Sequence, residues 1–290
     1  MTDPIDKHLV RRAFGRAAAD YDRAAVLQRE VGARMLERLD VVRLQPKLVL
    51  DAGAGTGAQA ELLLRRYRDA RVLALDFALP MLQRARRRGG WRRRPGCLCG
   101  DLEQLPLVDA CVDLVYSNLA LQWVNGLDQV FAECLRVLRP GGLFMFTSFG
   151  PDTLKELRAA WAGVDSGYAH VSPFLDMHDV GDALMRARFA DPVMDVEHLV
   201  LTYAEVDGLM RDLKSIGAAN ANRARFRAMT GKRRMGAMRA AYEDFRGPDG
   251  RLPATFEVVY GHAWAPAQRR SAGETRVPVE ALRKRRPGEA

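Results

Sequence analysis

The chain has 290 residues, of which 48% are hydrophobic and 28% charged, and its formal net charge is +9. This composition is ordinary for a soluble globular protein, and the length suits one large domain with insertions. No apolar run reaches the length of a membrane span and the first residues lack signal-peptide character, so we expect a cytoplasmic protein without a membrane segment. The cysteines (Cys97, Cys99, Cys111 and Cys134) lack zinc spacing, so we expect reduced, buried thiols, no disulfide and no metal.

The first 40 residues have the periodicity of helices. Apolar side chains recur at helical spacing from Leu9 to Ala18, and a second amphipathic stripe runs from Val26 to Leu39. From residue 47 onward, strand and helix patterns alternate. The predicted strands span residues 47–51, 71–76, 97–100, 112–117 and 143–149, with helices over 59–67, 79–87 and 127–138. This alternation predicts parallel βαβ units in an α/β fold with a doubly wound, Rossmann-like sheet.

After residue 150 the alternation loosens. Residues 151–190 and 204–246 are expected to be helical insertions, and residues 193–203 and 255–263 to be the sixth and seventh strands. Pro140, Gly141 and Gly142 are expected to end a helix and turn into the fifth strand. We expect a single domain over residues 1–265, with its cofactor-binding core at 47–149, and a basic, disordered tail over 266–290.

A glycine turn follows the first predicted strand. Glycine occupies every second position from Gly53 to Gly57, directly after the apolar run that ends in Asp51. Glycines accept positive φ and let a ligand lie against the backbone, while the next helix points its N-terminal amides at the turn. The turn therefore predicts a nucleotide-like cofactor, and it also satisfies the dinucleotide pattern G-x-G-x-x-A with Ala58.

Carboxylates at three strand ends favour S-adenosylmethionine over a dinucleotide. Asp51 would repel a pyrophosphate but can pair with the amino group of a methionine moiety. Asp76 can accept both ribose hydroxyls, or it can merely cap the following helix. Asp101 can accept the adenine amino group beside Leu102, or it can be only a turn residue. Asn118, at the end of the fourth strand, reaches the same crevice.

As a set, the segments LDAGAGTG, GDLEQLP, DLVYSNLALQW and LRPGG, with Asp76, resemble the class I methyltransferases that use S-adenosylmethionine, over residues 47–149. The resemblance implies a mostly parallel, seven-stranded sheet whose last strand is antiparallel, with the N-terminal helices and the late insertion forming a lid. It implies these cofactor-binding residues: Asp51, Gly53, Ala54, Gly55, Gly57, Asp76, Phe77, Met81, Asp101, Leu102 and Asn118.

The flanking segments at residues 14–28, 117–124, 148–157 and 212–218 are similar to the malonyl-acyl-carrier-protein O-methyltransferases of biotin synthesis, over the chain to about residue 266. The mitochondrial complex I assembly factor, which shares part of these motifs, is the second reading, and a methyltransferase for another small carboxylic acid is a third. The first implies methyl transfer to the free carboxylate of a malonyl thioester on an acidic carrier protein. Methyltransferases that act on amino groups carry an Asn/Asp-Pro-Pro-aromatic tetrad after the fourth strand, and this tetrad is absent after Tyr116. We therefore expect no nucleic-acid partner. We also expect a monomer.

This reaction needs no general base, because a carboxylate is already ionised at pH 7. Alignment and exclusion of water can carry it, so we expect a clamp for the carboxylate and a lid rather than a catalytic histidine. Candidate residues for the substrate side, each with a plain structural or solvated alternative, are Tyr21, Gln122, Trp123, His170, Lys214 and Arg225.

Two basic stretches stand out. The arginines from Arg84 to Arg94 are interpreted as a solvated run, because they lie on and after the C-terminal end of a predicted helix, on the rim of the sheet opposite the cofactor crevice. Lys214 and the cations of residues 223–234 are expected to receive the acidic carrier protein, because the late insertion should cap the crevice.

Overall fold

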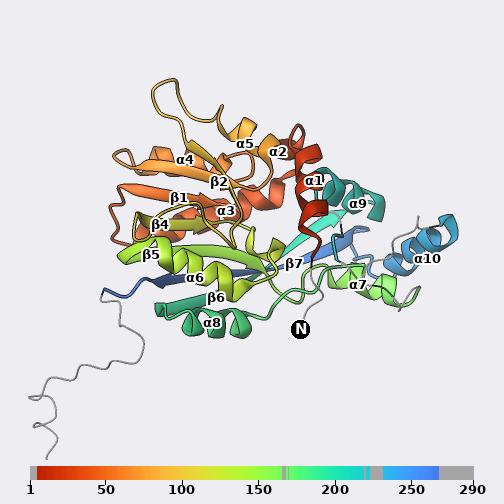
Figure 1. Cartoon of the computed structure of the whole chain (residues 1–290). Helices are drawn as coiled ribbons and strands as arrows, with labels where there is room; N and C mark the ends of the chain where they lie inside the picture. Colours follow the sequence, from red (N-terminus) through yellow and green to blue (C-terminus); the bar gives the residue numbers. More distant parts are fainter. Residues whose placement is uncertain (1–4, 165–167, 169, 219, 223–230, 268–290) are drawn as a thin grey trace, which may run out of the picture.

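The computed structural model describes the chain except for residues 1–4, 165–167, 169, 219, 223–230 and 268–290 (Figure 1). A seven-stranded sheet with the order β3-β2-β1-β4-β5-β7-β6 forms its centre. Strands β1 to β5 pair in parallel, and β7 pairs antiparallel with both β5 and β6. This confirms the doubly wound α/β prediction. The strands are β1 (Leu48–Ala52), β2 (Arg71–Asp76), β3 (Gly96–Cys99), β4 (Val112–Ser117), β5 (Leu138–Phe149), β6 (Ala190–Tyr203) and β7 (Leu252–Trp264).

Helices cover both faces of the sheet, because successive residues of a buried strand point to opposite sides. Val49 packs into a core with α3 and α4, whereas Leu50 packs into a second core with α6 and α8. The α-helices are α1 (Lys7–Ala17), α2 (Tyr21–Ala24), α3 (Val26–Arg38), α4 (Ala58–Arg66), α5 (Leu79–Ala85), α6 (Leu127–Val137), α7 (Lys155–Ala162), α8 (Met177–Arg186), α9 (Val206–Ser215) and α10 (Lys232–Glu243). Two 3-10 turns, η1 (Leu39–Val41) and η2 (Leu121–Trp123), complete the set in the described residues.

Several helices outside the alternating core gather at one end of the sheet. Figure 1 shows α1, α2 and α9 beside one another there, with α7 and α10 next to them. Backbone contacts agree, because a Cβ on Gly217, just after α9, would lie 3.2 Å from the backbone of Ala13 and of Phe14 in α1. The N-terminal helices and the late insertion therefore meet over the carboxyl ends of the strands, where open α/β sheets bind ligands.

The start of β5 corrects one prediction. The preceding helix ends at Val137, and Pro140 to Gly142 lie within β5 rather than in a turn before it. Val112 of β4 pairs with Leu138 of β5, but Leu114 already pairs with Leu143, so residues 139–142 of β5 form a bulge. The positive φ of Gly141 (76°) allows this local excursion.

The cysteines also differ from expectation, since Cys99 is exposed and only Cys134 is fully buried. All four thiols are free. Among the described helices, none is long and apolar enough to cross a membrane. The predicted tail lies almost entirely outside the described residues.

Candidate active site

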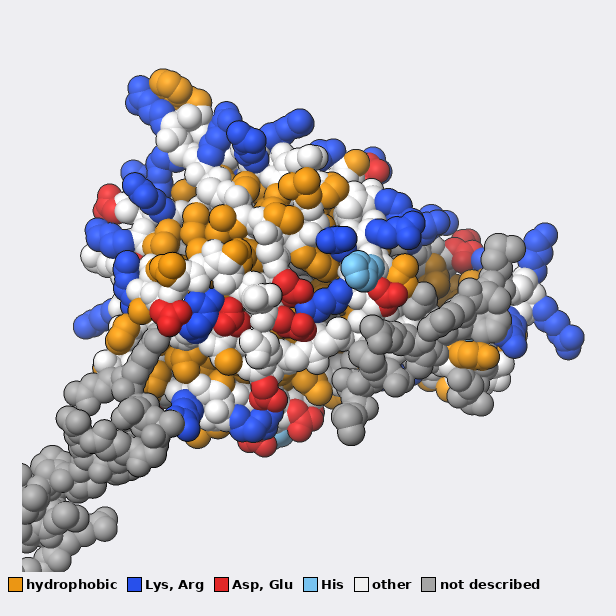
Figure 2. Space-filling model, viewed as in Figure 1, with side chains coloured by type: hydrophobic (Ala, Val, Ile, Leu, Met, Phe, Trp, Pro, Cys, Tyr) orange, Lys and Arg blue, Asp and Glu red, His pale blue; other side chains and the backbone are white. Residues whose placement is uncertain are grey.

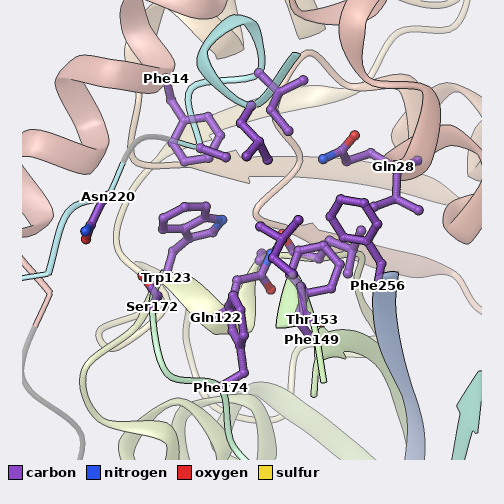
Figure 3. Close-up of a pocket in the computed structure, with 18 of the residues that line it drawn as sticks. Phe14, Gln28, Gln122, Trp123, Phe149, Thr153, Ser172, Phe174, Asn220 and Phe256 are labelled. Carbon is purple, nitrogen blue, oxygen red and sulfur yellow. The ribbon is translucent and has the colours of Figure 1, made fainter. Parts of the chain in front are cut away.

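A cavity of about 580 Å³ lies at the carboxyl ends of the central strands. Its floor comes from the turns that follow β1, β2 and β4, and its cover comes from α1, α3 and α9. Figure 3 shows Phe14 and Trp123 facing each other inside it, with Phe149, Phe174 and Phe256 further along. One half of the cavity is therefore built on the glycine turn and the other on aromatic side chains.

The glycine turn requires glycine for two physical reasons. Gly53, Gly55 and Gly57 have φ values of 80°, 55° and 79°, a region that side-chain-bearing residues rarely adopt. A Cβ at Gly53 would also lie 2.3 Å from the Cβ of Ala120, in the turn after β4. Over Gly55, by contrast, the nearest neighbour that a Cβ would meet is Cε1 of Tyr21, at 4.0 Å. The backbone at Gly55 thus faces open space into which a ligand can settle.

Asp76 joins the end of β2 to this turn. Its Oδ2 accepts the amide of Gly55 at 2.9 Å, and its Oδ1 accepts the amide of Ala78 at 2.8 Å. Burial raises the pKa of the Asp76 carboxyl to about 6, although these amides oppose the shift. The side chain both braces the turn and lines the cavity, and each oxygen keeps a lone pair for a ligand hydroxyl.

Asp51 lies under the turn and does not line the cavity. The side chain is 1% exposed, and its Oδ2 has no hydrogen-bond partner among the described residues. Burial raises the pKa of Asp51 to about 8, against a hydrogen bond from the amide of Ala60. The structure does not bring this carboxylate to the cavity surface, where pairing with a ligand amino group would place it.

We expect Asp51→Asn to stabilise the ligand-free protein more at pH 9 than at pH 6. The folded protein holds the Asp51 proton up to about pH 8, whereas the unfolded chain releases it near ~4. The folded state therefore binds more protons over this interval, and the free energy of unfolding falls as the pH rises through it. Asparagine removes that loss. Thermal unfolding of both proteins at the two pH values measures the difference.

Asp113→Asn is a control of opposite sign. Partial burial opposes its charge, but the amides of Leu48 and Lys47 and the guanidinium of Arg139 lower the pKa of this carboxyl overall. Its stabilisation is present near neutral pH and is lost as the pH falls through the folded pKa, so this variant should be destabilised at both pH values. An equal loss of melting temperature for Asp51→Asn at both pH values would contradict the burial argument.

Asp101 is held by a lysine from the N-terminal helix. The Nζ of Lys7 lies 2.6 Å from Oδ2 of Asp101 and 2.7 Å from Oε2 of Glu103. Asp101 also accepts the amide of Glu103 at 3.0 Å, so it is a turn residue as well as a cavity residue. This ion pair fastens α1 over the cavity beside Leu102.

Asn118 is occupied by protein partners. Its Nδ2 donates to the carbonyl of Gln28 in α3 at 2.9 Å, and its Oδ1 accepts from the hydroxyl of Thr147 in β5 at 2.9 Å. The same hydroxyl accepts the amide of Leu119 at 2.9 Å, and Leu119 has a φ of +49°. Thr147, which is fully buried, therefore fixes a strained turn beside Gly53.

The second half of the cavity is mainly apolar. It is lined by Phe149, Leu154, Leu157, Trp161, Val171, Phe174, Leu201, Tyr203, Met210, Leu213, Met235 and Phe256. Gln122 and His170 are among the polar residues of the cavity. Gln122 donates from Nε2 to the carbonyl of Leu119 at 2.7 Å, which leaves its Oε1 buried and without a partner among the described residues. The ring of His170 stacks on Trp161, 3.9 Å between centroids and 5° from parallel.

Comparison with known proteins decides between the readings of this cavity. Residues 50–146 match the family described as a methyltransferase domain. The chain is 57% identical, over 272 residues and 91% of each chain, to the malonyl-[acyl-carrier protein] O-methyltransferase of Laribacter hongkongensis. It is 53% identical, over 283 residues and 95% of each chain, to that of Methylovorus sp.. The chain belongs to the malonyl-[acyl-carrier protein] O-methyltransferase family.

Solved structures share the fold at low identity. The YcgJ protein of Bacillus subtilis has a TM-score of 0.57 at 15% identity, covering 80% of this chain and 97% of that one. The [4+2]-cyclase SpnF has a TM-score of 0.52 at 20% identity, covering 82% of each chain. Since a cyclase shares the architecture, the fold alone does not determine the reaction. Membership of the O-methyltransferase family favours this interpretation of the chain over the complex I assembly factor.

In this family member, the cavity gathers most of the residues singled out from the sequence. Among the cofactor candidates, Gly53, Gly55, Asp76, Phe77, Asp101, Leu102 and Asn118 line it, whereas Asp51, Ala54, Gly57 and Met81 do not. Met81 is buried with Ala18 and Ala78, and a Cβ at Gly57 would collide with Ala85. Both therefore serve packing behind the cavity.

The substrate candidates Tyr21, Gln122, Trp123, His170 and Lys214 also line the cavity, and Arg225 lies outside the described residues. Burial, followed by the charges of Asp76 and Asp22, raises the pKa of Tyr21, so its hydroxyl stays protonated at neutral pH. Sequence reasoning missed Lys7, Phe14 and Gln28. They sit on amphipathic helices, and no spacing marks which of their polar or aromatic residues turn towards the crevice.

Thr147→Val should slow methyl transfer and lower stability, while Thr147→Ser should retain both. Valine fills the same volume but leaves the amide of Leu119 and the Oδ1 of Asn118 without their partner, at about 1–3 kcal/mol for each buried group. Thermal unfolding and steady-state kinetics measure the two effects. The serine variant keeps the hydroxyl, so a serine variant as impaired as the valine variant would show that the methyl group, and not the hydrogen bonds, matters.

Proposed function

We propose that the chain transfers a methyl group from S-adenosylmethionine to the free carboxylate of a malonyl thioester carried by an acyl-carrier protein. The observation that carries this proposal is a two-part cavity, with a glycine turn in one half and an apolar chamber in the other, in a chain whose relatives bear this activity in their names. The cavity size is within the usual range for small-molecule sites.

Three features of the glycine half fit the proposed cofactor. The open backbone at Gly55 can receive the methionine end, with the ring of Tyr21 over it. The free lone pairs of Asp76 suit ribose hydroxyls. Phe77 and Leu102 line the cavity beyond Asp76 and offer apolar surfaces to a planar base. We assign Asp51 an indirect role, through the position of the turn.

The residues around the reaction centre position the substrate and keep water away. S-adenosylmethionine, when bound, supplies an electrophilic methyl group that a carboxylate can attack without losing a proton first. The turn at Leu119, fixed by Thr147, lines the cavity, and the aromatic side chains around the substrate would keep water from the attacking carboxylate. We assign His170 no proton transfer, because its ring stacks flat on Trp161 and the reaction requires no base.

Lys214 is the proposed partner of the substrate carboxylate. Among the described cavity residues, the other lysine, Lys7, is already paired with Asp101 and Glu103, whereas Lys214 stands exposed at the rim on α9. Lys214→Met should raise KM for the malonyl substrate roughly fivefold, the effect of about 1 kcal/mol expected of an exposed ion pair. Arg211→Met, one turn earlier on α9 and outside the cavity lining, is the matched control. Equal KM values for the two variants would remove Lys214 from the site.

The proposed function is tested by incubating the protein with S-adenosylmethionine and malonyl-carrier protein and measuring the intact mass of the carrier. We expect the mass of one added methyl group on the malonyl carrier. Acetyl-carrier protein, which lacks the free carboxylate, should remain unchanged. Methylation of both carriers would place the acceptor elsewhere, and methylation of neither would reject the proposed substrate.

A further inference from the structure

The outer face of α1 is basic and has no counter-charge of its own. Helix α1 reads KHLVRRAFGRA and contains no acidic residue. Arg11, Arg12 and Arg16 are exposed, and none of the three makes an ion pair with another residue in the described part of the chain. We call these three residues the α1 arginine face. Uncompensated cations at this density create a local positive potential that attracts acidic partners.

The same helix covers the cavity from its other side. Lys7 and Phe14 line the cavity, and Phe14 packs edge-on against Trp123 with 5.3 Å between ring centroids. The chain just after α9 touches α1 at Ala13 and Phe14, which places Lys214 and the rim close to the helix. Figure 2 shows Lys and Arg side chains gathered over the region of α1 and α9. A partner seated on the α1 arginine face would therefore sit beside the opening of the site.

The nearby carboxylates have partners other than the α1 arginine face. Asp101 and Glu103 are both paired with Lys7, and Asp20, just after α1, is paired with Arg23. Asp212, the exposed carboxylate on α9, interacts with the hydroxyl of Tyr203.

The arginines from Arg84 to Arg94 are partly structural, which corrects their interpretation as a solvated run. Arg88 pairs with Asp22 at 2.5 Å and donates to the carbonyl of Thr56. Arg93 donates to carbonyls around the end of α4, including those of Leu64 and Tyr67, at 2.8 and 3.1 Å. Arg84, Arg86 and Arg87 remain exposed there, and none of them lines the cavity.

We propose that the α1 arginine face docks the acidic carrier domain that bears the malonyl thioester. The proposal rests on the proposed function for the identity of the partner. It differs from the expectation that the cations of residues 223–234 dock the carrier. Residues 223–230 of that cluster lie outside the described part, and Lys232, Arg233 and Arg234 do not line the cavity. Helix α1 carries three exposed arginines without an ion pair to any described residue, and the same helix also helps to close the site.

The test reverses charge in three matched sets. The first variant carries Arg11→Glu, Arg12→Glu and Arg16→Glu. A second carries the same change at Arg84, Arg86 and Arg87, which alters the net charge equally, and a third carries it at Lys232, Arg233 and Arg234. For each, calorimetry measures Kd for carrier protein without a malonyl group at low and high salt. Kinetics then compare malonyl-carrier protein with a malonyl thioester of a small thiol.

For the first variant we expect Kd and KM for the carrier to rise about tenfold or more at low salt, with a smaller change at high salt, where exposed charges are screened. Turnover of the small thioester should stay at the wild-type level. The second variant should behave as wild type. An unchanged Kd in the first variant, or a larger effect in the second or third, would overturn the proposal. The glutamine versions of the first set, which should show a smaller effect in the same direction, keep the test valid if the reversed protein unfolds.

The binding arm separates this proposal from the proposed function. If the wild type binds the carrier through the α1 arginine face but methylates neither malonyl substrate, the docking proposal stands and the reaction is wrong. If the wild type methylates the small thioester but fails to bind the carrier, docking is wrong and the reaction stands.

Discussion

Replacing Gly53 by alanine should abolish measurable binding of S-adenosylmethionine and lower the melting temperature. Two costs coincide at this position. Its φ of +80° costs a side-chain-bearing residue about 1–2 kcal/mol, and the new Cβ would lie 2.3 Å from the Cβ of Ala120. Relief of that collision would separate the turn after β1 from the turn after β4, and these two turns form the floor of the cavity. Calorimetry with the cofactor and thermal unfolding measure the two consequences.

Two further variants separate the effect of backbone strain from the effect of the steric collision. Gly141 has a φ of +76°, and no atom lies within 4 Å of the position that a Cβ would take there, so Gly141→Ala should show only the backbone cost and keep cofactor binding. In the double variant Gly53→Ala with Ala120→Gly, the colliding methyl group is gone, and the steric part of the loss should be recovered. If the double variant binds no better than Gly53→Ala alone, strain rather than the approach of the two turns governs the site.

Asp76→Asn should weaken S-adenosylmethionine by roughly 1–3 kcal/mol, the cost of leaving polar groups without partners. An amide offers one acceptor oxygen where the carboxylate offers two, and its NH2 would face the amide of Gly55 or of Ala78. The turn and the proposed ribose contacts would both suffer. Calorimetry gives the loss directly, and Asp109→Asn, which alters only a surface pair with Arg136, serves as the control.

The pH dependence of binding provides an independent reading of Asp76. Its pKa in the folded protein is raised to about 6, so a proton is taken up as the pH falls through 6 and one acceptor oxygen is lost. The Kd of the wild type should therefore rise on acidification from pH 7.5 to pH 5, while that of Asp76→Asn should stay flat over this range. Parallel curves for the two proteins would assign the pH effect to another group. In the ligand-free protein, the raised pKa means that stability falls as the pH rises from about 4 to 6.

Local sequence patterns were sufficient to predict the architecture. The alternation of strands and helices after residue 47 predicts parallel βαβ units, and the structure has β1 to β5 in parallel. The spacing of Gly53, Gly55 and Gly57 predicts a turn with positive φ, and all three adopt it. These features follow from sterics and periodicity within a few residues, so the surrounding fold is not needed to read them. The bulge at the start of β5 escaped prediction, because it depends on pairing with β4.

The candidate site was likewise predicted in part from the sequence and decided in part by the tertiary structure. Sequence determined that Gly53, Gly55, Asp76 and Asn118 meet, because each follows a parallel strand and such strands end at one edge of the sheet. Only the tertiary structure decided how close each side chain comes. Asp51 lies beneath the glycine turn and does not line the cavity. The side-chain amide of Asn118 is hydrogen-bonded to the carbonyl of Gln28 and to the hydroxyl of Thr147.

The helices that cover the site could not be identified from the sequence. Lys7 reaches Asp101 across 94 positions, and Phe14 meets Trp123 across a similar span, through the packing of α1 on the crevice. Helical periodicity shows that such a helix has an apolar side, but not which element it packs against. Sequence thus determined the sheet and the turn through short-range sterics, and the charges at the strand ends predict the kind of cofactor. The tertiary structure decided which helix closes the site and which cations remain unpaired, because both depend on contacts between distant segments.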